Sequence, residues 1–221
     1  MKRLFLLVAL LMLSAQRDPI LVPEVSQSEV QVRQGFTGTE LLLFGAILDP
    51  QGQRAGEQYD IVVVLKGPTT PIRVREKERV AGIWVNAEST ASSAPIENLV
   101  DERTAAIYEL GTDFIQLSPS GMIDIEEQRR FSHGLVDLRG RQGLYKQNMG
   151  GVKISERVLY QARIELPSNV QTGTYTAETF AIARGRVIAS AIAEVEVRKV
   201  GFERFIEDFS QKQAFLYGLL A

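Results

Sequence analysis

The sequence predicts a mainly β protein with a helical insertion, and three observations support this class. Short apolar or alternating segments recur between turn-forming residues, as in strands joined by tight turns. Residues from about 95 to 150 break this rhythm and place apolar side chains at helical spacing. The composition, 45% hydrophobic and 24% charged, is that of a chain that can bury an ordinary core.

Strand patterns fill the region before the insertion. Residues 29–34 alternate and residues 40–48 are nearly all apolar. With the turn residues 35–38 between them, they predict a hairpin whose second strand is buried. Residues 59–65 contain four β-branched side chains in a row, which predicts a central strand. Residues 72–80 predict one further strand.

The insertion, at about residues 95–150, is expected to be mostly helical. Pro95 suits the first turn of a helix, which would run to Leu110. Residues 124–139 predict a second helix, because three of their apolar side chains recur at helical spacing: Phe131, Leu135 and Leu138.

Strand character returns after the insertion and brings the total to about seven strands. Residues 158–166 alternate between apolar and polar side chains, and residues 175–183 and 187–197 predict two more strands. Tyr175 follows a Pro-to-Gly corner, where immunoglobulin-like folds place a tyrosine whose hydroxyl bonds back to the corner. We therefore predict an immunoglobulin-like β-sandwich over residues 16–200, with no linker that would divide it.

The start of the chain predicts export. Lys2 and Arg3 precede an apolar run over residues 4–13, and small residues follow it at Ser14 and Ala15. A run of about 10 apolar residues is too short to span a bilayer, so residues 1–15 are interpreted as a cleaved signal peptide. An exported chain without cysteine is compatible with the bacterial periplasm.

The last segment, residues 201–221, predicts a C-terminal amphipathic helix. Four of its apolar side chains share one helical face: Phe202, Phe205, Ile206 and Phe209. Two interpretations of the apolar residues that follow are open. They either dock on the body of the protein or begin a membrane anchor.

Composition excludes several kinds of catalytic and metal site. With no cysteine and a single histidine, His133, the chain offers no thiolate nucleophile and no multi-histidine metal cluster. The sequence contains no phosphate-binding loop and no nucleophile elbow. A pI near 5.6 argues against binding of nucleic acid. We therefore expect no cofactor and no nucleic-acid partner.

One candidate site is acidic and one is basic. The acidic residues Asp124, Glu126 and Glu127 could serve a carboxylate-dependent hydrolase or transferase, or bind a divalent cation. Acids in the first turn of a helix more often complement its dipole.

The basic candidate lies on the strand expected over residues 72–80. Alternation along a strand places four basic residues on one face: Arg73, Arg75, Lys77 and Arg79. Such charges often protect an edge strand from aggregation. Their functional interpretation is a contact for an anion, a lipid head group or an acidic partner.

Several stretches resemble one known family over nearly the whole mature chain. They are residues 42–46, 60–64, 67–68, 79–86, 143–145, 164–167, 173–175 and 199–204. The most specific are Gly-Ile-Trp-Val-Asn at residues 82–86 and Gly-Phe-Glu-Arg at residues 201–204. Together they are similar to the alphaproteobacterial putative transmembrane protein family.

The resemblance implies a signal peptide, an exported domain and a C-terminal membrane helix, with no catalytic residue assigned. It also implies genes that lie near sulfite-exporter-type permeases. We therefore expect a periplasmic domain tethered to the inner membrane, with residues 201–221 as the possible start of a truncated anchor. Its expected role is a non-enzymatic binding or accessory module for an inner-membrane partner such as an anion (sulfite-type) permease. The alternatives are the carboxylate-dependent enzyme and a purely structural envelope protein.

Overall fold

A computed structural model of the chain describes residues 19–49, 58–76, 79–115, 118–119 and 124–201. The predicted signal peptide and the predicted C-terminal helix lie outside these residues. None of the described helices is both long and apolar enough to cross a membrane.

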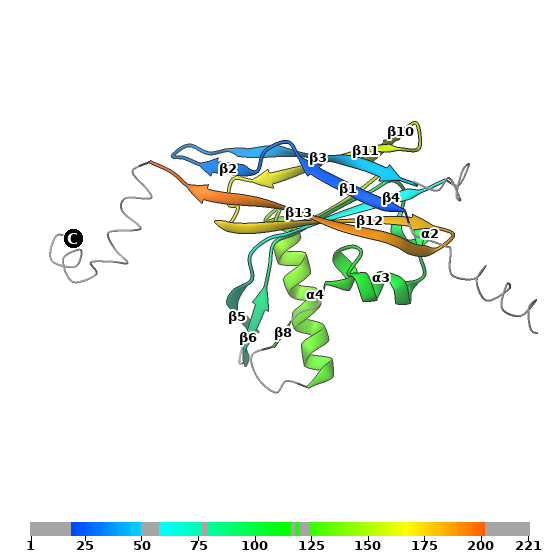
Figure 1. The fold of residues 1–221 in the computed structure, drawn as a ribbon. Helices are drawn as coiled ribbons and strands as arrows, with labels where there is room; N and C mark the ends of the chain where they lie inside the picture. The colour runs from blue at the N-terminus through cyan, green and yellow to red at the C-terminus, as the bar shows by residue number, and fades with distance from the viewer. Residues whose placement is uncertain (1–18, 50–57, 77–78, 116–117, 120–123, 202–221) are drawn as a thin grey trace, which may run out of the picture.

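The described chain is mainly β and forms three sheets (Figure 1). The four-stranded sheet is antiparallel and has the order β1 (Ile20–Val25), β3 (Gly38–Leu48), β11 (Leu159–Pro167), β10 (Val152–Ser155). The six-stranded sheet has the order β2 (Glu29–Val32), β13 (Arg186–Lys199), β12 (Gly173–Ala183), β4 (Asp60–Lys66), β7 (Glu88–Ser92), β9 (Tyr145–Met149). The small third sheet contains β5 (Thr70–Glu76), β6 (Arg79–Val85) and β8 (Ser118–Pro119).

The two large sheets pack face to face around the main core. On β11 every second side chain is buried, as the alternation predicted: Tyr160, Ala162, Ile164 and Leu166. These residues pack with inward side chains of β3, β4, β12 and β13 in one cluster. The sandwich core therefore lies between β3–β11 on one side and β4–β12–β13 on the other.

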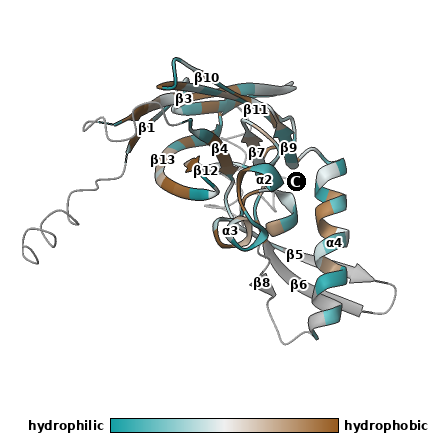
Figure 2. Ribbon diagram, turned by 90° about the vertical axis from the view of Figure 1, so that its right-hand side faces the viewer, coloured by the Kyte–Doolittle hydropathy of each residue, from teal (hydrophilic) through white to brown (hydrophobic). Residues whose placement is uncertain are grey.

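Strand β4 is buried on both faces, which explains its unbroken apolar run. Ile61, Val63 and Leu65 face the sandwich core, whereas Val62 and Val64 pack against the helices on the outer face. These helices are α2 (Ile96–Leu99) and α3 (Glu102–Tyr108), followed by the short 3-10 helix η1 (Thr112–Phe114). Figure 2 shows the resulting order of layers: sheet, sheet, helices.

The helical insertion differs from the prediction in two details. The helix expected from Pro95 to Leu110 is split, because Val100 is extended (φ −144°, ψ 162°) and α3 starts anew. Between α4 (Ile125–Arg141) and β10, the insertion also contributes β9, which pairs in parallel with β7. The prediction of a helix at residues 124–139 is confirmed by α4.

Two predicted strand arrangements are wrong. Residues 29–34 and 40–48 do not form a hairpin: β2 pairs in parallel with β13, whereas β3 pairs with β1 and β11. Only the inward half of β3 is buried, since it lies in a sheet with one exposed face. The single strand expected over residues 72–80 is divided between β5 and β6, which pair antiparallel with Glu76 opposite Arg79.

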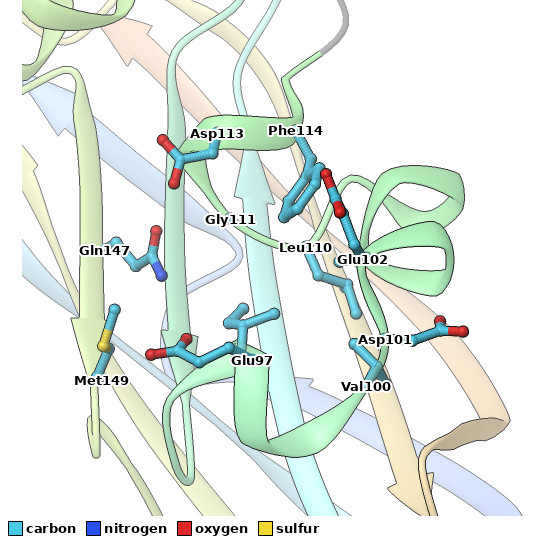
Figure 3. Close-up of a pocket in the computed structure, with 12 residues that line it drawn as sticks. Glu97, Val100, Asp101, Glu102, Leu110, Gly111, Asp113, Phe114, Gln147 and Met149 are labelled. Atoms are coloured by element: carbon cyan, nitrogen blue, oxygen red, sulfur yellow. The ribbon is translucent and has the colours of Figure 1, made fainter.

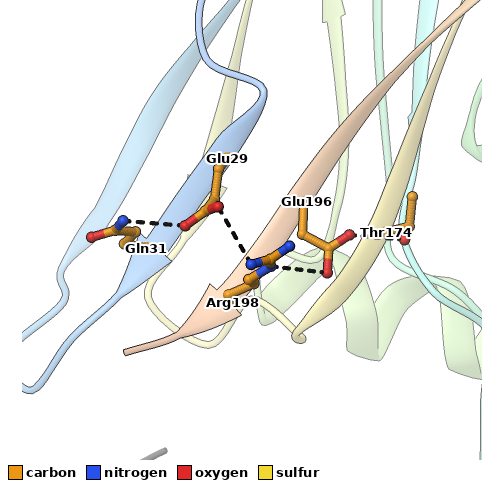
Figure 4. A network of polar contacts seen from close by, with 5 residues as sticks. All are labelled: Glu29, Gln31, Thr174, Glu196 and Arg198. Atoms are coloured by element: carbon orange, nitrogen blue, oxygen red, sulfur yellow. Dashed lines mark hydrogen bonds and ion pairs between the residues drawn. The ribbon is translucent and has the colours of Figure 1, made fainter. Parts of the chain in front are cut away.

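A polar network joins three strands at one edge of the six-stranded sheet (Figure 4). Arg198 on β13 lies 3.6 Å from a carboxylate oxygen of Glu29 on β2, and its Nε donates to Glu196 at 3.4 Å. The hydroxyl of Thr174 on β12 donates to the other Glu196 oxygen at 3.1 Å. These side-chain contacts therefore add to the backbone hydrogen bonds that pair β2 in parallel with β13.

Candidate functional site

A pocket of about 680 Å³ lies between α2, α3, η1 and β9 (Figure 3). Its apolar wall is built from side chains of the helix-covered core: Ile96, Val100, Ala105 and Leu110. Phe114 and Met149 extend this wall toward the opening, where Met149 is 51% exposed. The volume falls in the range of ordinary ligand pockets.

Four exposed carboxylates line the same pocket: Glu97, Asp101, Glu102 and Asp113. In Figure 3, those of Glu97 and Asp113 lie on the side of Gln147 and Met149, whereas that of Asp101 lies at the outer end. No Lys, Arg or His is found among the described residues that line the pocket. The pocket is therefore acidic at its rim and apolar beneath.

Local hydrogen bonds fix the shape of the pocket. The Asp101 carboxylate caps α3 by accepting a hydrogen bond from the Thr104 N–H at 2.8 Å. Hydrogen bonds with the side chain and the backbone of Thr104 lower the pKa of Asp101. On the opposite wall, Gln147 Oε1 accepts from both the N–H and the hydroxyl of Thr112 at 3.3 Å. Gly111 has φ +104° and leaves room for this amide, since a Cβ there would lie 3.1 Å from Gln147 Oε1.

The four carboxylates lie at the N-terminal ends of α2, α3 and η1, where negative charge stabilises a helix. This role alone does not require them to surround one cavity. Their spacing does not suit a metal ion, because no group of three or more His, Cys, Asp or Glu in the described part of the chain could hold one. Separated negative charges above an apolar wall instead suit a cation with an apolar stem, such as the side chains of Lys and Arg.

A second group of charges lies on the same side of the six-stranded sheet. Lys66 Nζ on β4 lies 2.7 Å from Glu109 and 3.2 Å from Glu178, beside a pocket of about 350 Å³. Burial lowers the pKa of Lys66, but the hydrogen bonds and charges of the two carboxylates outweigh burial and raise it. Glu109 reaches this position from a left-handed backbone (φ 52°, ψ 46°) at the end of α3.

Glu88 on β7 is the register partner of Lys66 and is only 1% exposed. Burial raises the pKa of Glu88 to about 8, with Lys66 opposing the rise and Glu109 and Glu178 adding to it. Its Oε1 has no hydrogen-bond partner among the described residues, and the same holds for the buried hydroxyl of Tyr145 beside it. Glu88 is therefore an enclosed carboxyl whose pKa lies well above its ordinary range.

The acidic residues predicted as a site do not converge on a cleft in the described structure. Asp124 is the N-cap residue of α4 but makes no side-chain capping bond, and Glu126 is exposed in the first turn. The side chain of Glu127 lies outside the described residues. His133 is exposed on the same helix.

The predicted basic residues divide between two strands. Arg73 and Arg75 lie on β5, and Arg79 is the first residue of β6. Lys77 and the side chains of the other three lie outside the described residues, so their role as a contact stays a prediction.

The residues that line the acidic pocket, and Glu88 beside Lys66, were not predicted from the sequence. Glu97, Glu102 and Asp113 fall within 17 residues that contain a single basic residue, Arg103, and this local excess of acid is a signal that could have been used. Glu88 gives no such signal, because it stands in an ordinary polar stretch, Glu-Ser-Thr-Ala-Ser.

No curated protein matches the chain. The model of a family described as "Putative transmembrane protein (Alph_Pro_TM)" matches residues 20–221, which include all the described strands and helices. The chain therefore belongs to the Alph_Pro_TM family of putative transmembrane proteins.

Proposed function

We propose that the chain is a non-enzymatic binding module, exported to the periplasm and tethered to the inner membrane, whose acidic pocket receives a basic segment of an inner-membrane protein. The observation that carries this proposal is the combination of four carboxylates, an apolar wall and no described basic residue in one pocket. Complementary charge favours rapid encounter with a cationic partner and selects against anionic ones.

An immunoglobulin-like sandwich is the scaffold that we propose for this module. Support comes from the strand order, in which one antiparallel sheet of four strands faces a second sheet whose edge strand β2 pairs in parallel with the last strand. Tyr175 supports it by position alone: it is 2% exposed near the start of β12, directly after the corner, but its hydroxyl has no hydrogen-bond partner among the described residues. Burial raises the pKa of Tyr175 to about 12, and the nearby Gln171 backbone opposes this rise.

A protein segment fits the pocket better than a compact ion. Lys and Arg stems can lie along Leu110 and Phe114 while their charged ends reach Glu97 and Asp113. An anion (sulfite-type) permease remains the proposed example of an inner-membrane partner. The basic residues Arg73, Arg75, Lys77 and Arg79 are the proposed second contact, for an anion or an acidic part of that partner.

An enzymatic function has less support. A general acid or base must reach its substrate, but Glu88, whose pKa is raised to about 8, is 1% exposed. Asp124 and Glu126 are exposed along a helix. A purely structural role would not require an acidic pocket.

The proposal is tested first with a defined probe, a labelled amphipathic peptide of Lys and Leu, and its Glu and Leu counterpart. The pocket variant Glu97→Gln/Glu102→Gln/Asp113→Asn leaves the α3 cap Asp101 intact. Its control, Glu126→Gln/Glu156→Gln/Glu194→Gln, removes equal charge at exposed sites elsewhere. We expect the basic peptide to bind about tenfold more weakly to the pocket variant alone, with affinity falling as salt rises. Equal affinity for all three proteins would contradict the pocket.

The partner is tested in the native bacterium. A photoreactive amino acid in place of Met149, at the pocket opening, should cross-link to an inner-membrane protein in carbonate-washed membranes. The cross-link should disappear when the three pocket carboxylates are neutralised. Cross-links that persist in that variant would show that the partner is bound elsewhere.

A further inference from the structure

One end of the outer face of the four-stranded sheet is apolar. Register pairs Ile20 with Leu48 on neighbouring strands, and Val22, Ala46 and Leu159 form the next row across the sheet. Five large apolar side chains on this face are exposed: Ile20 by 52%, Val22 by 45%, Phe44 by 40%, Leu48 by 42% and Leu159 by 56%. We call these five residues the apolar patch.

The other end of the same face is charged. Arg163 on β11 forms an ion pair with Glu40 on β3 at 2.5 Å. Glu165, two residues farther along β11, forms an ion pair with Lys146 at 2.7 Å. An antiparallel sheet that faces water usually presents polar side chains throughout. Contiguous exposed apolar side chains with a polar border are typical of an interaction surface.

We propose that the apolar patch is a two-fold interface with a second copy of this chain. The first argument is area. The four strands contain 6, 11, 9 and 4 residues, and at the usual spacing along and between strands their face covers about 480 Å². This is more than half of the about 800 Å² that each partner contributes to a stable dimer, so the face can supply the centre of such an interface.

The second argument is charge. One row of the sheet reads Glu24, Phe44, Gln161, Lys153 from β1 to β10, so opposite charges stand at its two ends. Both charged residues are exposed. A two-fold axis along the strands, between β3 and β11, places Glu24 opposite Lys153 of the partner subunit, and does so twice. The row is therefore complementary to itself, a property that contact with a lipid surface would not need.

The absence of native cysteine allows a direct test on the purified full chain. Ala46 lies between Val22 and Leu159 on this face, near the axis, so an Ala46→Cys variant should be joined to a second copy by a short bifunctional thiol cross-linker that spans two packed sheets. The matched control is Ile192→Cys, on β13 of the other sheet, where the native side chain is 60% exposed. Cross-linking of Ala46→Cys and not of Ile192→Cys is the expected result. Equal cross-linking of both, or none, would overturn the proposal.

Charge exchange in the Ala46→Cys background sharpens the test. Glu24→Lys alone and Lys153→Glu alone should each reduce cross-linking several-fold, because each change creates two like-charge contacts. The double variant should restore it, and failure to restore it would overturn the two-fold arrangement. Circular dichroism checks that each variant is folded.

A chain that stays monomeric but sediments with phosphatidylglycerol vesicles through this patch would assign the patch to lipid instead and overturn the dimer. The proposal is independent of the acidic pocket, which lies on the other sheet.

Discussion

Lys66 and Glu88 are register partners on the adjacent strands β4 and β7, so a lysine that bridges two carboxylates lies beside a carboxyl that is almost completely buried. Four charged or ionisable groups from β4, β7, β12 and the end of α3 thus meet beneath the helical layer. Their protonation and pairing tie α3 to the sheet.

Glu88 should make stability fall as pH rises. Its pKa is raised from 4.5 to about 8 by folding, so between these pH values the folded chain holds a proton that the unfolded chain has released. This contribution is fully present below pH 4.5 and lost as pH rises through about 8. In urea unfolding, the free energy of unfolding of the wild-type protein should fall by a few kcal/mol between pH 5 and pH 9, and Glu88→Gln should remove this fall. The control Glu194→Gln, at an exposed site, should keep the wild-type slope, and an unchanged slope in Glu88→Gln would refute this role.

Replacing Lys66 should cost much more than replacing Lys146. Both form an ion pair at 2.7 Å, but the side chains of Lys66 and Glu109 are 19% and 25% exposed, against 39% and 70% for Lys146 and Glu165. Lys66→Met leaves partly buried carboxylates without their cation and should lower the free energy of unfolding by about 2 to 3 kcal/mol. Lys146→Met should cost under about 1 kcal/mol. Similar losses, measured by urea unfolding at pH 7, would show that burial does not set the strength of these pairs.

Two glycine substitutions should have opposite signs. A Cβ at Gly45 would lie 2.3 Å from the Val22 carbonyl oxygen and 2.6 Å from the Tyr160 hydroxyl, so Gly45→Ala should destabilise by about 1 to 3 kcal/mol. Gly134 lies within α4 with nothing near its Cβ position, and Gly134→Ala should stabilise by about 0.5 to 1 kcal/mol. Thermal unfolding of both variants measures the difference. A destabilised Gly134→Ala would show that α4 needs a flexible position there.

Leu110 should be essential to the wall of the acidic pocket. It is 0% exposed and packs with Phe180 and Val62, so Leu110→Ala should cost about 2 to 5 kcal/mol. Ile107, on α3 and 62% exposed, is the matched control, and Ile107→Ala should cost under about 1 kcal/mol. Chemical unfolding followed by circular dichroism compares them. A small loss in Leu110→Ala would mean that the helices rest only loosely on the sheet.

Local patterns predicted elements well where one side chain period dominates. The alternation of β11 and the helical spacing of α4 reflect elements with one buried face, and the apolar run of β4 reflects a strand buried on both faces. The partner of a strand is a different matter. Nothing in residues 29–32 indicates that they pair with residues 196–199, because that pairing depends on contacts far apart in the chain.

The same limit applies to the candidate sites. Glu109 and Glu178 lie 43 and 112 residues from Lys66 in sequence, and only the sheet and the end of α3 bring them together. β9 was missed because its central residues, Lys146, Gln147 and Asn148, are polar and lack a strand pattern. The acids at residues 124–127 were visible as a cluster, but a cluster in sequence is not a cleft.

The parallel pairing of β2 with β13 has a mechanical consequence. Strand β1 begins and strand β13 ends at opposite ends of the sandwich (Figure 1), so tension applied between these two points would pull the parallel strands β2 and β13 in opposite directions along their length. The backbone hydrogen bonds of this pair, and the contacts of Arg198 with Glu29, would then be strained together and not one after another. A domain stretched between these two points should resist extension in shear, whereas pulling across the antiparallel β5–β6 hairpin would separate it bond by bond.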